Sequence, residues 1–164
     1  MIDEKTQVVV RSFDPTRDAE SLRDCVIEQQ DFHRHLEPSW PTGDAIVGEY
    51  LAYLDAECAA HNGCIIMADC GQEAAGFACV VATTRNEAPD DPAPFAQIHD
   101  VYVKPEYRGQ GVADMLIAEA ERFARSNGAR LMRLGVLSGN GRARNFYSRQ
   151  GFREYARVLT KSLE

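Results

Sequence analysis

The stretch YRGQGVAD, residues 107–114, combines residue types that suit the binding of an anion. Gly109 and Gly111 lack the side chains that would keep a ligand away from backbone N–H groups, and a helical pattern starts directly after them. The first N–H groups of a helix have no carbonyl partner inside it and the helix dipole is positive there, so a phosphate group fits such a turn. The spacing matches neither the P-loop nor the dinucleotide-binding fingerprint. On spacing alone, a plain turn between strand and helix is the alternative.

The elements that must position this turn are predicted from hydrophobic periodicity and from capping and turn residues. Strands are expected at 7–13, 64–70, 74–84, 95–103, 130–137 and 152–163. Helices are expected at 14–30, with Asp14 as N-cap, and at 44–63, 111–128 and 141–150. A proline-containing loop, 33–43, joins the first two helices. The order βααβββαβαβ predicts an α/β or α+β fold in which a sheet is layered with helices.

Length and composition indicate an ordinary globular chain. With 164 residues, 45% of them hydrophobic and 26% charged, the sequence predicts one domain that spans 1–164, and it excludes wholesale disorder. The five cysteines include no C-x-x-C pair and lie mostly in apolar surroundings, so we expect buried thiols without a metal site or a disulfide framework. Cys64 and Cys70 flank one predicted strand and are the pair to check.

Charge is distributed unevenly along the chain. Residues 1–107 carry 7 Lys and Arg against 20 Asp and Glu, a balance of −13, whereas residues 108–164 carry 11 against 5, a balance of +6. The C-terminal part therefore suits an anionic ligand and the N-terminal part a cationic one, although two solvated faces would give the same pattern. The Arg residues form no basic run with interleaved aromatic residues, so a nucleic-acid partner is not expected. An acidic start and the lack of an apolar run of about 18 residues predict a cytoplasmic protein with no membrane partner.

Two stretches resemble the GNAT superfamily of acetyl-CoA-dependent N-acetyltransferases. Residues 108–113, RGQGVA, fit its [Q/R]-x-x-G-x-[G/A] signature, and VYVKPEYRGQGVADMLI resembles its usual passage from strand to helix. Downstream, VLSGNGRARNFYSRQGF resembles the end of the family's domain, with Asn140, Ala143, Tyr147 and Gly151–Phe152 in their usual relative positions. The resemblance follows the element order over 7–160 and is specific over 95–153. It implies the GNAT fold: a central, mixed, mostly antiparallel and splayed sheet flanked by helices.

The resemblance also implies where acetyl-CoA would bind. In such enzymes the pyrophosphate lies on the amides of the turn, and the pantetheine arm pairs like an extra strand with the strand before it. Asn140 is implied to support the cofactor where the strands splay; a turn role between two glycines is its alternative. The cofactor-binding residues expected on this basis are Val101, Tyr102, Val103, Arg108, Gly109, Gln110, Gly111, Val112, Ala113, Asp114, Asn140 and Tyr147.

Catalytic roles are expected at two positions. Family members often carry a tyrosine at the place of Tyr147, where a phenol can protonate the departing thiolate; without the resemblance, core packing is the simpler interpretation. His99 precedes the signature at a position where other family members carry a histidine or a glutamate, so we expect a base or proton relay there; a chain of water molecules is the alternative. Strand alternation predicts that His99 and Asp100 point to opposite faces.

The resemblance implies transfer of an acetyl group from acetyl-CoA to a primary amine by direct attack, through a ternary complex. Asp100, His33 and Trp40 are the expected contacts of the amine, the last two from the early loop, for which an ordinary polar loop is the alternative. The acidic N-terminal part favours a small cationic acceptor, such as a polyamine-like molecule. Two rival interpretations are a protein or peptide N-acetyltransferase and a non-catalytic acyl-CoA-binding module. Dimers are common in the family, and the last strand could pair across subunits.

Overall fold

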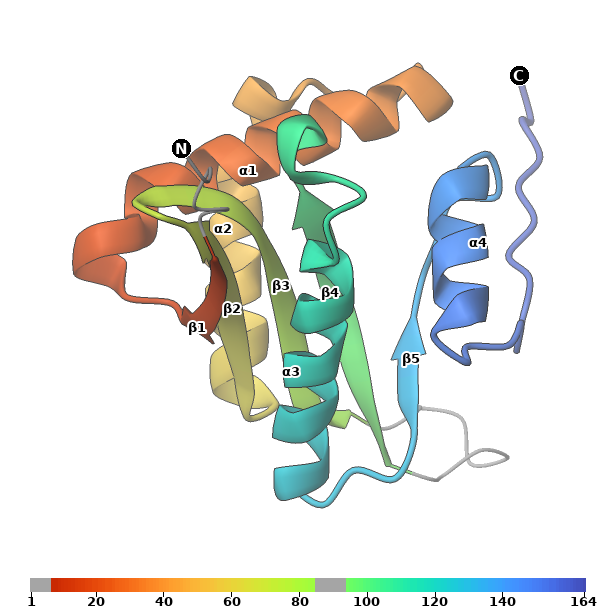
Figure 1. Ribbon diagram of the computed structural model, residues 1–164. Helices are drawn as coiled ribbons and strands as arrows, with labels where there is room; N and C mark the ends of the chain where they lie inside the picture. The colour runs from red at the N-terminus through yellow and green to blue at the C-terminus, as the bar shows by residue number, and fades with distance from the viewer. Residues whose placement is uncertain (1–6, 85–93) are drawn as a thin grey trace.

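The computed structural model describes residues 7–84 and 94–164 as a sheet covered by helices on both faces (Figure 1). The strands are β1 (Val8–Ser12), β2 (Gly63–Cys70), β3 (Glu73–Thr84), β4 (Phe95–Val103) and β5 (Met132–Leu134). The helices are α1 (Pro15–Leu36), α2 (Gly43–Ala60), α3 (Val112–Ser126) and α4 (Gly141–Arg149), with a single 3-10 turn, η1 (Pro105–Tyr107), before α3. The predicted element order is confirmed as far as α4.

The sheet has the order β1-β2-β3-β4-β5. β1 to β4 pair antiparallel, and β5 pairs parallel to β4. The helix α3 covers one face, where Leu116 and Ala120 pack against Val80 and Ile98. On the other face, α1 and α2 bury Met67 and Phe77 of the sheet. The mixed, mostly antiparallel sheet flanked by helices is therefore confirmed.

The first helix is longer than predicted. Asp14 caps it as expected, with its side chain accepting from the amide of Thr16. However, α1 continues past residue 30 to Leu36, because the first residue that opposes helical geometry is Glu37, which precedes Pro38. His33 therefore lies in the last turn of α1, and the prediction that placed it in a loop is wrong.

The sheet opens between β4 and β5. Their ladder consists of three pairs, from Ala96–Met132 to Ile98–Leu134, after which β4 continues to Val103 without β5 beside it. The strand predicted at 130–137 is thus confined to Met132–Leu134. Figure 1 shows the two strands diverging, with α4 beyond the gap. The predicted splay is present, and it leaves one edge of β4 available to a ligand.

A β-bulge in β4 lies directly beside this opening. Asp100 pairs with Cys79 and Ile98 with Val80, so His99 is the extra residue in β4. An extra residue bends its strand and interrupts side-chain alternation. His99 and Asp100 consequently both face α2, where they contact Tyr53 and Tyr50 respectively, and the prediction that they face opposite sides is wrong.

The last predicted strand, 152–163, is absent. Residues 152–164 contain neither helix nor strand and run past α4 outside the sheet (Figure 1). Two physical reasons account for the error. The neighbouring strand β5 offers only three residues for pairing. The apolar residues Tyr155, Val158 and Leu159 do not follow a period of two, so neither face of the segment would be apolar. Val158 and Leu159 are 92% and 89% exposed.

A cluster of ion pairs joins β1, α1 and β2. The guanidinium of Arg11 binds both carboxylate oxygens of Asp18, at 2.6 and 2.8 Å, and donates through Nε to Asp69 at 2.7 Å. Asp18 also accepts from the amide of Asp14 at 2.8 Å. These bonds, led by those from Arg11, hold the pKa of Asp18 below its ordinary value of 3.8.

Asp18→Asn should lower the free energy of unfolding by about 2 kcal/mol at pH 7, because it leaves the half-buried Arg11 partly unpaired. Since the folded pKa of Asp18 lies below the unfolded value, its stabilisation is present above pH 3.8 and is lost as pH falls through the folded pKa. Urea unfolding at pH 7 and pH 3 checks both points. The exposed Asp24 on the same helix provides the control variant Asp24→Asn. Equal losses for the two variants at pH 7 would contradict the role of the cluster.

The five cysteines are free thiols. Cys64 and Cys70 lie at opposite ends of β2, whereas Cys58 and Cys79, which were not singled out from the sequence, have sulfur atoms 3.7 Å apart. Within residues 7–84 and 94–164, no group of three or more His, Cys, Asp or Glu side chains is placed to hold a metal ion. None of the helices in the described part of the chain is long and apolar enough to cross a bilayer.

Candidate active site

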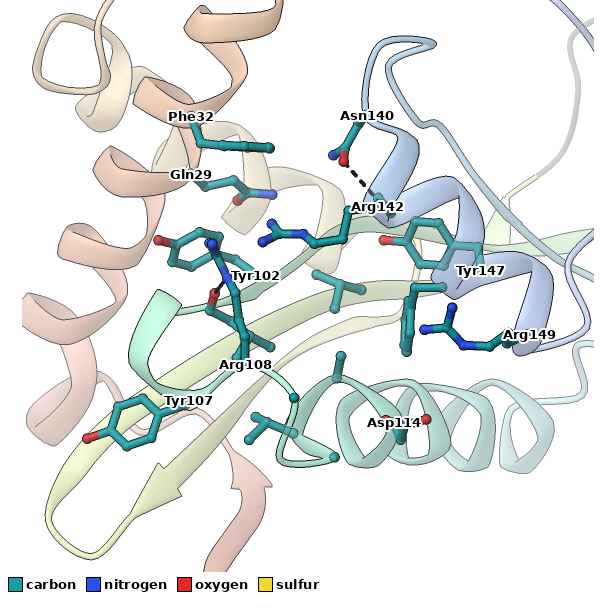
Figure 2. Close-up of a pocket in the computed structure, with 18 of the residues that line it drawn as sticks. Gln29, Phe32, Tyr102, Tyr107, Arg108, Asp114, Asn140, Arg142, Tyr147 and Arg149 are labelled. Carbon is teal, nitrogen blue, oxygen red and sulfur yellow. Dashed lines mark hydrogen bonds between the residues drawn. The ribbon is translucent and has the colours of Figure 1, made fainter.

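Two adjoining pockets occupy the opening beside β4. The first, of about 310 Å³, lies between the end of β4, the turn before α3, and α4 (Figure 2). Among its lining residues are all but one of the predicted cofactor-binding residues: Val101, Tyr102, Val103, Arg108, Gly109, Gly111, Val112, Ala113, Asp114, Asn140 and Tyr147. Gln110 is the exception, since its side-chain amide turns back to the carbonyl of Glu106 at 2.9 Å.

The turn before α3 presents backbone amides to the first pocket. Gly109 and Gly111 have φ angles of 74° and 81°, a region that favours glycine, and a Cβ built on either would meet no atom within 4 Å. The first amide of α3 with a carbonyl partner inside the helix belongs to Met115, which donates to the carbonyl of Gly111. The preceding amides lie at the positive end of the helix dipole. The turn thus has open space and free amides, which are the features that an anion-binding turn requires.

Basic side chains from two elements face the same pocket. Arg108 follows η1 and donates through Nε to the carbonyl of Val103 at 2.9 Å. Arg142, on α4, reaches across the pocket and lies 5.4 Å from the ring centroid of Phe32 (Figure 2). Burial, and then the neighbouring Arg108, lower the pKa of Arg142. An anion bound between the two guanidinium groups would relieve the repulsion between their positive charges.

Arg142, Arg149 and Phe32 were missed from the sequence. Arg142 and Arg149 both line the first pocket and are seven residues, or two helical turns, apart on α4. That spacing, within the basic C-terminal part, was the signal that could have identified them. Phe32 carries no such signal, because only the unexpected length of α1 brings it to the pocket.

Two predicted residues have structural partners of their own. Asn140 caps α4, its side-chain oxygen accepting from the amide of Ala143 at 3.1 Å, so the turn role is present and a role towards the cofactor stays a prediction. Asp114 accepts a hydrogen bond from Gln150 at 2.7 Å. Its negative charge is unfavourable beside a phosphate, so its carboxylate is better explained as a link between α3 and the end of α4.

The second pocket, of about 440 Å³, lies between α1, α2, the bulge of β4 and the chain after β5. His33, Trp40, His99 and Asp100, which the sequence predicted on the acceptor or base side, all line it. Six residues line both pockets: Gln29, His33, Val101, Asn140, Ala143 and Tyr147. The two spaces therefore meet at the edge of β4, at α4, which carries Tyr147, and at the last turns of α1.

This arrangement can be compared with known proteins. The family model described as the acetyltransferase (GNAT) family matches residues 28–152. The chain belongs to this family. An uncharacterised N-acetyltransferase of Archaeoglobus fulgidus is 29% identical to this GNAT protein over 136 residues, which are 83% of this chain and 89% of the relative. A solved structure of an aminoglycoside N-acetyltransferase in complex with CoA superimposes with a TM-score of 0.72 at 22% identity, over 99% of this chain and 98% of that one.

Higher identities are confined to short stretches. A thialysine N-epsilon-acetyltransferase of Bos taurus is 43% identical over 54 residues, which are 33% of this GNAT protein and 32% of the relative. The three relatives that share 40% to 43% identity are covered over only 26% to 34% of their length. Family membership thus rests on the domain match, and the acceptors of these relatives remain properties of those proteins.

His99 and Asp100 experience different surroundings within the GNAT sheet. Nε2 of His99 lies 3.2 Å from a carboxylate oxygen of Glu57, and Nδ1 lies 3.4 Å from the hydroxyl of Tyr53. Burial lowers the pKa of His99 below 6.5 although Glu57 opposes this. The carboxylate of Asp100 lies 2.9 and 3.1 Å from the hydroxyl of Tyr50. Burial raises the pKa of Asp100 to about 6, against the opposing effect of its hydrogen bonds.

Asp100→Asn should stabilise the fold at pH 7.5 by on the order of 2 kcal/mol, because Asp100 is only 5% exposed and holds a charge that burial disfavours. The folded pKa of about 6 exceeds the ordinary value of 3.8, so this cost develops as pH rises from about 4 to 6. Urea unfolding at pH 7.5 and at pH 3.5 should show the gain only at the higher pH. Asp55→Asn, at an exposed position of α2, is the control. A loss of stability at pH 7.5 would mean that the hydrogen bonds to the charge outweigh its desolvation.

Tyr147 projects from α4 into the first pocket, with its hydroxyl turned away from α4 (Figure 2), and it lines the second pocket as well. Its ring packs against Phe152, with centroids 5.7 Å apart. Burial, with a further contribution from the negative charge of Asp100, raises the pKa of Tyr147 to about 12. The phenol therefore keeps its proton at neutral pH and is able to donate it.

Proposed function

We infer that this GNAT protein transfers an acetyl group from acetyl-CoA to a primary amine of a small molecule, by direct attack within a ternary complex. The observation that carries this inference is the meeting of the two pockets at Val101, Asn140 and Tyr147. One pocket has the amides and cations that suit a phosphorylated donor, and the other has groups able to receive a proton. Two substrates held side by side can react without a covalent enzyme intermediate.

The first pocket fits coenzyme A on three counts. The open glycine turn would hold the pyrophosphate on its amides. Arg108, Arg142 and Arg149 would balance the charge of the phosphates. The unpaired edge of β4 from His99 to Val103 would give backbone partners to the amide-rich pantetheine arm. The last contact requires the side chain of Arg108 to release the carbonyl of Val103, to which it is bound in this structure.

The proposed reaction needs one group that donates a proton and one that accepts a proton. When bound, acetyl-CoA supplies the acetyl group as a thioester, whose carbonyl carbon bonds to the amine nitrogen as its bond to sulfur breaks. Tyr147 gives its phenolic proton to the departing sulfur, and the second proton that the nitrogen loses as the amide forms restores the phenol. Asp100 receives a proton from the ammonium group of the acceptor, with His99 as the alternative base. Both side chains line the second pocket with Tyr147, and Asp100 is preferred because the two ring nitrogens of His99 face Glu57 and Tyr53.

Initial-rate kinetics test this function directly. Thiol release from acetyl-CoA should depend on an added amine, and the mass of the amine should rise by one acetyl group. Double-reciprocal plots at several fixed amine concentrations should intersect, as expected for a ternary complex. Parallel lines would indicate a covalent acetyl-enzyme and contradict direct attack. CoA binding without thiol release from any amine or peptide would favour a non-catalytic binding module.

Gly111→Ala should weaken coenzyme A binding about 10-fold, because the added methyl group occupies the open space of the turn and displaces the anion from its amides. Calorimetric titration with CoA measures the change. Gly128→Ala is a matched control, since Gly128 has a similar φ of 85° and equally open space but lies at the other end of α3. Both variants should lose similar stability, and only Gly111→Ala should lose affinity. Equal affinities would remove the turn from the cofactor site.

A further inference from the structure

The composition of the second pocket restricts the acceptor amine; this inference rests on the proposed function. Among the described residues that line the pocket, Asp100 is the one side chain charged at neutral pH. His33 and His99 also line it, and burial lowers the pKa of both, so the neutral rings predominate. No Lys or Arg is among the described lining residues. The pocket thus offers one negative charge and no positive charge.

The remaining lining combines apolar residues with uncharged polar ones. Val26, Ile46, Val136 and Leu137 line the pocket together with the ring of Trp40. Trp40 and Val136 are 39% and 41% exposed, so their apolar surface is accessible to a ligand in this pocket. The rings of Trp40 and His33 are nearly perpendicular, with centroids 5.9 Å apart, so the indole has a packing partner. These apolar side chains line the same pocket as the carboxylate of Asp100.

We propose that the acceptor is a primary amine with a single positive charge on an apolar or aromatic body. The ammonium group would bind Asp100, and the body would cover Trp40 and Val136. A second ammonium group would be removed from water without a carboxylate partner, which is costly. A carboxylate on the acceptor would lack a cation and would be repelled by Asp100. The acidic surplus of residues 1–107 favoured a polyamine-like acceptor, but among the acidic residues that the structure describes in this range only Asp100 lines the pocket.

Matched pairs of amines test the proposal. Hexylamine and 1,6-hexanediamine differ by a second ammonium group, and 2-phenylethylamine and phenylalanine differ by a carboxylate. With acetyl-CoA saturating, kcat/KM should be about 10- to 100-fold higher for the first member of each pair. Trp40→Ala should lower kcat/KM for 2-phenylethylamine about 10-fold while the KM for acetyl-CoA stays unchanged.

These measurements test the proposed acceptor separately from the proposed acetyl transfer. Spermidine, an aminoglycoside or a peptide acetylated faster than the monoamines would overturn the proposed acceptor and leave acetyl transfer standing. An unchanged kcat/KM for 2-phenylethylamine in Trp40→Ala would also overturn the proposed acceptor. Acetyl-CoA binding with no thiol release from any of these amines would overturn the proposed function and the acceptor together.

Discussion

Tyr147→Phe should lower kcat by about 10²- to 10⁴-fold, the range that a positioned general acid contributes. The variant removes one oxygen and keeps the ring that packs against Phe146 and Phe152, so fold and cofactor affinity should be retained. The reason for the large effect is that the thiolate would then leave without a proton donor. The measurement is steady-state thiol release at saturating acetyl-CoA, with the KM for acetyl-CoA recorded in parallel.

A matched control is available on the same part of the chain. Tyr155 is 59% exposed and is absent from the lining of both pockets, so Tyr155→Phe should leave kcat unchanged. A more reactive donor provides a second check, because a thioester with a more acidic leaving thiol needs less help from Tyr147 and should restore part of the rate. If Tyr147→Phe matches the wild type in kcat, Tyr147 has only its packing role.

Asp100→Asn should lower kcat/KM for the amine by about 10²-fold or more, because the amide can neither accept a proton nor balance an ammonium group. In the wild type, kcat/KM should fall as pH drops below about 6, where the Asp100 carboxylate becomes protonated. The variant should lose this decline along with most of its activity. The expected gain in stability at pH 7.5 would show that the loss does not come from unfolding.

His99→Gln separates the two candidate bases. The glutamine keeps a polar side chain near Glu57 and Tyr53 but cannot accept a proton in this pH range. If Asp100 is the base, His99→Gln should retain the decline below pH 6 with a modest loss of rate. If the decline disappears in His99→Gln and persists in Asp100→Asn, the base is His99 instead.

The lining of the first pocket could be predicted because its geometry depends on the backbone, although the contacts of these residues with the cofactor stay predictions. A turn with Gly109 and Gly111 between a strand and an amphipathic helix specifies its own geometry, and these residues line one pocket in the structure. The cap at Asn140 is equally local. Such features are encoded by a few neighbouring residues, so one sequence suffices to find them.

The acceptor side could be predicted only in part, because it depends on contacts between distant segments. Tyr50 and Gln29 support Asp100 from two different helices, and no spacing in the sequence links them. The length of α1 moved His33 from a loop to a helix, and the bulge at His99 reversed a face assignment based on alternation. The domain extent, the oligomeric state and the cytoplasmic location stay predictions.

The bulge makes strand β4 tolerant of a change in its length at one position. Ile98 and Val101 pack on the side of α3, and His99 and Asp100 lie between them facing α2. Removal of residue 99 would restore regular alternation and leave Asp100 facing α2. Residue 99 is therefore a position in β4 where the deletion of one residue leaves the remaining side chains on their present faces. Relatives whose strand β4 is one residue shorter should therefore lack the residue at this position, and with it the histidine.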